Sequence, residues 1–388
     1  MIGVMNLKLF KYMDKILLFV TLLLFAFGTV MVFSASNVSS YMRYSDTPYF
    51  YLTRQLAVLF VSLLVALFVI LLNVKTTSRL ASLVTYALIV SLFLLFVFGR
   101  ITNHAQSWFK LGPINLQPSE FFKVAMIIWA ARYYDVKKNN LDSYGTALYP
   151  LFIVLIAVGA IVLQPDLGTA LIVLMIFAFI FVITPIDKTI KSKIYMLFSI
   201  IAVIGILIII SFGKSFLSDT QMSRITSVIS SDSPCSEENY YTDGNQVCNG
   251  YIAINNGGLT GRGLGKSIQK YLYLPESHTD FIICIIIEEL GLLAGIGLLI
   301  LYIIVLARIV IIGRHAKNNR DAIICYAGAF YIFIHIVVNL LGVFGVIPMT
   351  GVPLPFMSYG GSYTLSLVIL LSVVQRICFE TRIKDAYS

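Results

Sequence analysis

The sequence predicts an all-α polytopic membrane protein that crosses the bilayer ten times. Of its 388 residues, 59% are hydrophobic and only 12% are charged, whereas soluble domains carry about 25% charged residues. The apolar residues gather in stretches long enough to cross a bilayer, and lysine and arginine gather in alternate connections between them. We therefore expect a single transmembrane domain over residues 1–388.

Each predicted span is an apolar stretch that approaches the length of about 20 residues needed to cross a bilayer. The first, 16–34, is too long for the core of a signal peptide, and no convincing cleavage site follows it. The fifth and sixth are short and are separated only by Gln164–Gly168, so we expect them to form a tight hairpin. The predicted spans are 16–34, 56–73, 80–99, 119–134, 148–163, 169–184, 194–212, 281–306, 322–343 and 363–379.

Positive charges set the predicted orientation. If the N-terminus is cytoplasmic, eighteen lysines and arginines fall in cytoplasmic segments and nine in outer segments, five of these nine in one long loop. Cytoplasmic connections of membrane proteins carry an excess of these residues, so both termini are placed in the cytoplasm. The same pattern accounts for the net charge of +9 without a nucleic-acid partner.

The connection between the seventh and eighth spans is a large extracellular loop over about 213–280. Loops of this length are usually functional or disordered. This one holds Cys235 and Cys248, which an exported loop can join in a disulfide; two free thiols are the alternative. The four histidines are scattered, and no cysteine–histidine spacing resembles a zinc site.

Three predicted spans begin on the outer side with an acid in a tight motif. The motifs are Gln117–Glu120, Gln164–Thr169 and His278–Phe281, with the acids Glu120, Asp166 and Asp280. One interpretation is helix capping, because a carboxylate in the first turn accepts unpaired amide protons and complements the helix dipole. The other is a phosphate site, since several helix N-termini at one level can cradle an anion. Ionisable groups at the membrane boundary favour a function.

Glu288 and Glu289 extend this pattern. If Asp280 opens the eighth span, the pair lies about 12–14 Å inside it, at 1.5 Å of rise per residue. Adjacent carboxylates point in different directions on a helix. We therefore expect one to bond a neighbouring span and the other to face a hydrated cavity.

The glycine-rich segment Gly257–Ser267 resembles a phosphate-binding loop but has the wrong spacing. The Walker pattern requires glycine where Thr260 stands, and the dinucleotide fingerprint requires it where Lys266 stands. We interpret the segment as a flexible basic loop whose Arg262, Lys266 and Lys270 meet anionic lipid headgroups or phosphate.

The segment Pro348–Ser362 holds three prolines and three glycines, so it is not a regular helix. Irregular backbone at membrane depth is tolerated where it is buried in protein or lines a wet cavity. We expect this segment, including Ser358, to line a cavity; a plain outer turn is the alternative.

Together these motifs resemble the SEDS family (shape, elongation, division and sporulation). They run in the family's order over almost the whole chain, and ten spans with both termini inside is also the family's plan. The matching stretches are Val32–Ser36, Arg54–Gln55, Gln117–Glu120 with Lys123, Pro165–Ala170, Leu274–Phe281, Glu288–Gly291 and Pro355–Ser362.

Within the family, the stretch Gly263–Pro275 looks more like the division branch than the elongation branch, as does the Ser-Ala-Ser ending of the first span. Two features depart from the pattern. The insert between Cys235 and Cys248 is not part of it, and Ile283–Ile285 replaces a usual Phe-Ala. Neither departure touches a motif acid.

The resemblance implies a peptidoglycan glycosyltransferase that polymerises lipid II, the undecaprenyl-pyrophosphate-linked disaccharide peptide. The reaction would take place at the outer face of the bacterial cytoplasmic membrane, at the division septum. Asp280 matches the family's catalytic aspartate and is the expected general base of an inverting transfer. The expected substrate-binding residues are Lys123 and Arg262 at the phosphates, with Glu120, Asp166, Gln117 and Ser358.

The partner implied by the resemblance is a class B penicillin-binding protein, a transpeptidase, together with other division proteins. No cofactor is assigned, although a divalent cation, magnesium or manganese, is compatible with the acids. The alternatives are an elongation polymerase of the same family, a lipid II flippase or transporter, and a non-enzymatic scaffold. A transporter would place its charges near the midplane and show repeat symmetry, whereas most motif acids here lie at the outer boundary.

Overall fold

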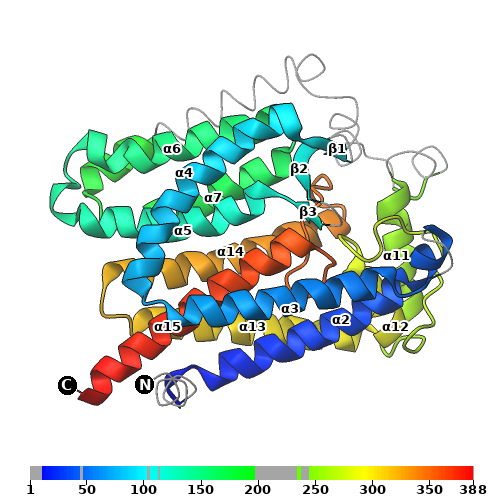
Figure 1. Cartoon of the computed structure of the whole chain (residues 1–388). Helices are drawn as coiled ribbons and strands as arrows, with labels where there is room; N and C mark the ends of the chain where they lie inside the picture. Colours follow the sequence, from blue (N-terminus) through cyan, green and yellow to red (C-terminus); the bar gives the residue numbers. More distant parts are fainter. Residues whose placement is uncertain are drawn as a thin grey trace.

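The chain folds into a bundle of long helices that lie side by side, and residues 15 and 387, the outer bounds of the first and last labelled helices, lie at the same end of the bundle (Figure 1). This computed structural model describes residues 11–43, 47–102, 105–111, 114–196, 234–236 and 244–387. Its helices are α2 (Lys15–Arg43), α3 (Phe50–Leu71), α4 (Val74–Phe98), α5 (Pro118–Val136), α6 (Tyr144–Leu163), α7 (Leu167–Ile183), α11 (Asn245–Gly257), α12 (Ile282–Leu290), α13 (Leu292–Arg314), α14 (Asn319–Val343) and α15 (Gly361–Tyr387).

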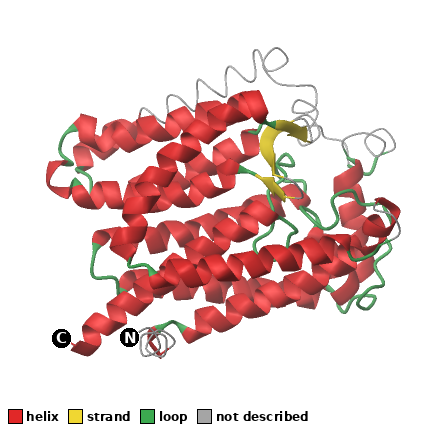
Figure 2. Cartoon of the chain, in the orientation of Figure 1, coloured by secondary structure: helices red, strands yellow, loops and turns green. Residues whose placement is uncertain are grey.

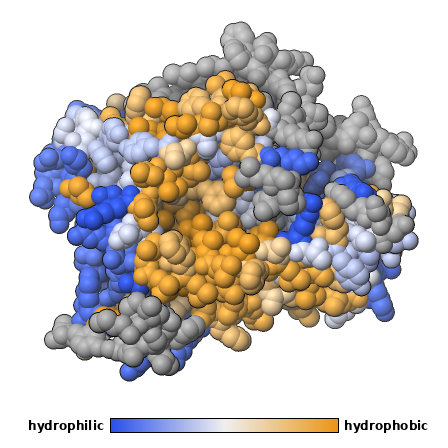
Figure 3. All heavy atoms as spheres, in the orientation of Figure 1, coloured by the Kyte–Doolittle hydropathy of each residue, from blue (hydrophilic) through white to orange (hydrophobic). Residues whose placement is uncertain are grey.

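Seven of the described helices are long and apolar enough to cross a bilayer, and α7 is a shorter apolar helix. The seven are α2, α3, α4, α6, α13, α14 and α15. A broad hydrophobic band crosses the middle of the face shown in Figure 3, and hydrophilic side chains gather at its two ends. The chain is therefore a multi-pass membrane protein. The predicted seventh span, 194–212, lies almost entirely outside the described residues.

The expectation of an all-α fold is wrong in one connection. Between α4 and α5 the chain forms a three-stranded antiparallel sheet, drawn in yellow in Figure 2, of β1 (Arg100–Thr102), β2 (Ala105–Leu111) and β3 (Ile114–Leu116). The register pairs Phe109 with Leu116 and Leu111 with Ile114. The sequence carries a signal for this hairpin, because a Gly-Pro pair separates two short stretches rich in apolar residues.

The predicted eighth span, 281–306, is also corrected, because it is two helices with a break at Gly291. Gly291 has φ 84° and ψ 169°, a region that is open almost only to glycine. A Cβ atom placed on Gly295 would lie 3.3 Å from the side chain of Ile287, so α12 bends over the first turn of α13. The α13 helix alone, with 23 residues, is about 34 Å long and therefore long enough to cross the bilayer.

The glycine-rich loop is held against this break, so the expectation of a flexible loop is wrong. The Gly258 and Leu259 carbonyls accept from the first two N–H groups of α13, at 2.9 and 3.2 Å. On the other side, the N–H groups of Arg262 and Gly263 donate to the last carbonyls of α12, at 3.0 and 2.8 Å. The loop thus satisfies backbone groups that both helix ends would otherwise leave unpaired.

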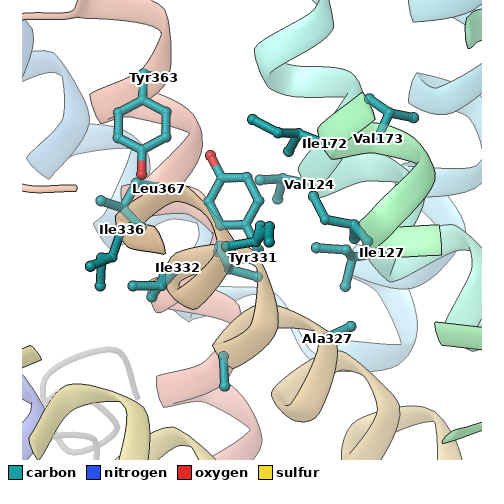
Figure 4. Close-up of a cluster of buried hydrophobic side chains, with 14 of the residues drawn as sticks. Val124, Ile127, Ile172, Val173, Ala327, Tyr331, Ile332, Ile336, Tyr363 and Leu367 are labelled. Carbon is teal, nitrogen blue, oxygen red and sulfur yellow. The ribbon is translucent and has the colours of Figure 1, made fainter. Parts of the chain in front are cut away.

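The bundle is centred on α14, which packs against α5, α7, α13 and α15. Figure 4 shows Tyr331 and Ile332 of α14 among Val124 of α5, Val173 of α7 and Leu367 of α15. All of these side chains are buried. His335 and Asn339 follow these core residues along α14, so the packing of this core also positions the two polar side chains.

Candidate functional site

Asp280 lies in the turn directly before α12, at the start of the helix. The N-cap of α12 is Phe281, with no side-chain capping bond. Asp166, by contrast, is the N-cap of α7, and its carboxylate accepts from the Thr169 N–H at 3.1 Å. The capping interpretation therefore describes Asp166 well, whereas the N-cap position of α12 is taken by Phe281, the residue after Asp280.

The backbone around Asp280 is fixed by three consecutive hydrogen bonds. The His278 carbonyl accepts from the Tyr359 N–H at 2.9 Å. The Thr279 carbonyl accepts from the Ser358 hydroxyl at 2.7 Å. The Asp280 carbonyl accepts from the Asn339 side-chain amide at 2.8 Å. The segment Pro348–Ser362, predicted to line a cavity, is thus the wall against which this turn is held.

The Asp280 carboxylate lies next to a glycine of that wall. A Cβ atom on Gly351 would be 3.6 Å from Asp280 Oδ2, and Gly351 has a left-handed φ of 69°. The neighbouring residue, Thr350, lies against the first turn of α7, because its carbonyl oxygen is 2.9 Å from a Cβ placed on Gly168. The wall therefore connects Asp280 to the outer end of α7.

Gln117 links three helix starts at the same place. Its side-chain amide donates to the Asp166 carboxylate of α7 at 3.3 Å. Its backbone N–H donates to the Ser362 hydroxyl in the first turn of α15 at 2.9 Å. Of the three helix starts predicted to converge, Gln117 thus joins those of α5 and α7; the third start that it joins, that of α15, was not among the predicted ones.

Glu120, Lys123 and His335 form a buried charge cluster one turn further into the bundle. Lys123 Nζ lies 2.9 Å from Glu120 and 3.0 Å from His335 Nε2, and Lys123 is 1% exposed. His335 Nδ1 lies 2.7 Å from the Tyr331 carbonyl. An ammonium only donates and a carbonyl only accepts, so His335 is neutral with its proton on Nδ1. In this conformation Lys123 is occupied by internal partners.

Arg262 and Ser358 are placed differently from the other predicted residues. Arg262 is exposed, and its backbone bonds the Glu288 carbonyl at the far end of α12; that helix, with nine residues, is about 13 Å long. Ser358 is buried and accepts from the Leu354 N–H at 2.7 Å while it donates to Thr279. Its hydroxyl is therefore engaged with backbone on both sides.

Glu288 and Glu289 are both fully buried at the C-terminal end of α12. Glu289 accepts from Ser34 of α2 at 2.7 Å and pairs with Lys270 at 3.1 Å. The expected bond to a neighbouring span is therefore present. Lys270 is itself buried, so its expected contact with lipid headgroups is wrong.

Glu288 does not face a hydrated cavity, as one of the two acids was expected to do. Its carboxylate accepts from the Ser267 hydroxyl at 2.5 Å and from the N–H groups of Ile268 and Gln269 at 3.1 and 3.3 Å. The reason is the ordered loop, which supplies donors where water was expected.

Sequence analysis missed two polar residues beside Asp280. Asn339 lies on α14 one turn from His335, and a buried amide within an apolar span is the signal that could have found it. His278 is buried against the rings of Tyr51 and Tyr359, at 4.3 and 5.9 Å between centroids. This burial lowers the pKa of His278 to about 4, so the imidazole is neutral near pH 7.

Within the described part of the chain, no three His, Cys, Asp or Glu side chains are grouped so that they could hold a metal ion. The acids of the three motifs therefore do not form a protein-only site for magnesium or manganese. Cys235 and Cys248 are joined in a disulfide with 5.1 Å between their Cα atoms, which ties residues 234–236 to α11.

A family model described as "Cell cycle protein" (FtsW, RodA and SpoVE) matches residues 14–383. A probable peptidoglycan glycosyltransferase FtsW from Bacillus subtilis (strain 168) is 36% identical over 94% of this chain and 89% of its own length. Stage V sporulation protein E from the same organism is 34% identical, over 93% of this chain and 94% of its own length.

Two solved structures share the fold. One is a chain from "Structural coordination of polymerization and crosslinking by a peptidoglycan synthase complex", with TM-score 0.75, 26% identity, and coverage of 95% of this chain and 98% of that one. The other is the rod shape determining protein RodA of Thermus thermophilus, with TM-score 0.66, 25% identity, and coverage of 97% and 98%. This chain belongs to the FtsW/RodA/SpoVE family of cell cycle proteins.

Proposed function

We propose that this protein is a peptidoglycan glycosyltransferase that polymerises lipid II at the outer face of the cytoplasmic membrane. Membership of the family supports this activity, as do relatives that carry the name peptidoglycan glycosyltransferase. The relatives named FtsW favour a role in septal synthesis during division over one in elongation.

The observation that carries the proposal is the position of Asp280. The turn that bears it is held through its backbone by Tyr359, Ser358 and Asn339, and its Oδ2 faces Gly351 of the wall. Hydrogen bonds to the backbone of its own turn hold this carboxylate in place. A carboxylate fixed in this way is suited to accept a proton.

The proposed reaction is one inverting displacement. The 4-hydroxyl of the acceptor sugar attacks C1 of the donor, the bond from C1 to the pyrophosphate oxygen breaks, and the β linkage forms. Asp280 takes the hydroxyl proton as general base. The lipid pyrophosphate leaves with the bonding electrons as an anion, so the reaction needs no second carboxyl group as an acid.

The leaving pyrophosphate needs positive charge or amide donors. Arg262 is exposed on the loop at the far end of α12, which suits a group that meets a large substrate. Lys123 would contact phosphate only after a rearrangement that releases it from Glu120 and His335. The Gln117 and Asp166 pair lies at the starts of α5 and α7 and is proposed to shape the substrate site.

A divalent cation would be held mainly by the substrate. Magnesium is commonly bound through one or two carboxylates together with substrate phosphates. The described acids do not form a set of three ligands, so the pyrophosphate would supply most of the coordination.

We further propose that the protein works with a class B penicillin-binding protein, which crosslinks the strands that this chain makes. The structural likeness to a chain of a peptidoglycan synthase complex supports such a partner. Nothing in the reaction above requires the partner to supply a reacting group.

The test is strand synthesis by the purified protein from labelled lipid II, with and without a class B penicillin-binding protein. Synthesis should depend on this chain and fall about 10²–10⁴-fold in Asp280→Asn, the usual effect of losing a general base. Asp142→Asn, at an exposed position in the connection between α5 and α6, serves as a matched control. If Asp280→Asn makes strands at the normal rate, Asp280 is not the base. If lipid II crosses vesicle membranes but no strand forms, the flippase alternative holds.

A further inference from the structure

Asn339 crosslinks the turn that carries Asp280 to the wall that faces it. Its side-chain amide nitrogen donates one N–H to the Asp280 carbonyl and the other to the Val352 carbonyl, both at 2.8 Å. The side chain is 4% exposed. Two segments that are far apart in the sequence therefore share one nitrogen atom of α14.

The crosslink joins two residues beside the proposed reaction site, Asp280 and Val352. Asp280 bears the carboxylate itself, and Val352 follows Gly351, where an added Cβ atom would lie 3.6 Å from Asp280 Oδ2. A shift of either carbonyl would change the position of the carboxylate relative to the wall. The side-chain amide of Asn339 thus fixes both the turn that carries Asp280 and the wall that this turn faces.

Few side chains could replace the amide. Asp would point its carboxylate oxygens at two carbonyl oxygens, and Ala would leave two buried carbonyls without their donors. Unpaired buried polar groups are destabilising, so either change should let the two segments separate. Thr has nearly the same size and keeps one hydroxyl donor, which could serve only one of the two carbonyls.

The helix that carries Asn339 is itself rigidly placed. One turn earlier, His335 is held between Lys123 and the Tyr331 carbonyl. The following residues of α14 reach the outer end of the helix at Val343. Asn339 therefore stands on a fixed platform rather than on a loop.

We propose that Asn339 is a positioning residue for Asp280, acting through the two carbonyls rather than on the substrate. This inference rests on the proposed function of Asp280. It predicts that loss of the amide lowers kcat and leaves KM nearly unchanged, because the substrate's binding contacts are kept. A displacement of about 1 Å can reduce a rate about 10²-fold.

The experiment compares Asn339→Ala and Asn339→Thr with wild type, using purified protein, its class B partner and labelled lipid II. We expect kcat to fall about 10–100-fold in Asn339→Ala and less in Asn339→Thr, with KM within about threefold for both. Ser366→Ala is the matched control, because Ser366 is fully buried in α15 but bonds only within the bundle.

Combining the variants with Asp280→Asn separates positioning from general stability. If Asn339 acts through Asp280, Asn339→Ala should cost no further activity once the base is gone. A purely structural role would lower activity by the same factor in both backgrounds and overturn the proposal. Should Asn339→Ala fail to fold, the same comparison is made with Asn339→Thr.

The outcomes also separate this inference from the proposed function. A normal kcat in both folded Asn339 variants, with Asp280→Asn inactive, would overturn the positioning role and leave the base in place. Normal activity of Asp280→Asn would overturn both.

Discussion

The two ends of α12 hold acids in opposite ways. At the C-terminal end, donors from Ser34, Lys270 and the loop converge on the carboxylates of Glu288 and Glu289. At the Asp280 end, the donors converge on backbone carbonyls instead. The first arrangement uses carboxylates to hold the fold. The second fixes the backbone of the turn, and the fixed backbone sets the position of the Asp280 carboxylate.

The largest expected contrast is between activity and stability at the two ends. Asp280→Asn should reduce strand synthesis about 10²–10⁴-fold with a thermal midpoint within about 2 °C of wild type, because surface-like substitutions change stability little. Rates and thermal midpoints measured on the same detergent-purified samples would check this. A large fall in the midpoint would place Asp280 with the structural acids.

Lys270→Met should destabilise the fold at the opposite end of α12, where Glu289 lies. It leaves Glu289 buried without its cation, and removal of one partner of a buried ion pair costs about 3–5 kcal/mol. Thermal or denaturant unfolding in detergent would measure the loss. Lys266→Met, four residues earlier on the same loop and exposed, is the control and should be nearly neutral. Equal effects in the two variants would show that the buried pair has no special role.

Glu288→Gln should have a smaller effect. Gln keeps one oxygen for the Ser267 hydroxyl and the Gln269 N–H, which share one carboxylate oxygen of Glu288, but its amide would face the N–H group of Ile268. Loss of such bonds at a buried site costs about 1–3 kcal/mol. The loop should also become more accessible to proteases near Ser267, which limited digestion would detect. An unchanged digestion pattern would argue that the backbone bonds at the Gly291 break hold the loop alone.

The smallest expected effect is a pH dependence of stability that arises from His278, at the Asp280 end of α12. The buried His278 has a pKa lowered to about 4, below the ordinary value of about 6.5. The unfolded chain therefore binds a proton first as the pH falls, and stability is lost between about pH 6.5 and pH 4. From pH 8 to pH 6 the loss should be about 1 kcal/mol. His278→Gln should remove this part of the pH dependence of the thermal midpoint.

Much of the helical framework follows from the sequence, because apolar length determines where helices cross a bilayer. The apolar run 281–306 was misjudged for the same reason, since hydropathy is high on both sides of Gly291. The sheet was missed because its strands are only 3 and 7 residues long. The helix starts at Glu120 and Asp166 followed from local motifs.

The acids of the candidate site could be predicted from the sequence, but the residues that hold the acids in place could not. Glu120, Asp166 and Asp280 stand out because acids are rare in an apolar chain. Asn339 and the burial of Lys270 depend on contacts between distant segments, which a single sequence does not display. The glycines that allow these contacts are visible in the sequence, but the partners that they approach are not.

The break at Gly291 bears on how the protein is made. During insertion, the run 281–306 is apolar enough to enter the membrane as one unit, with Glu288 and Glu289 inside it. In the finished fold those two acids are satisfied by Ser34 of α2 and by the glycine-rich loop. The C-terminal end of α12 can therefore reach its final packing only after α2 and this loop have come together with it.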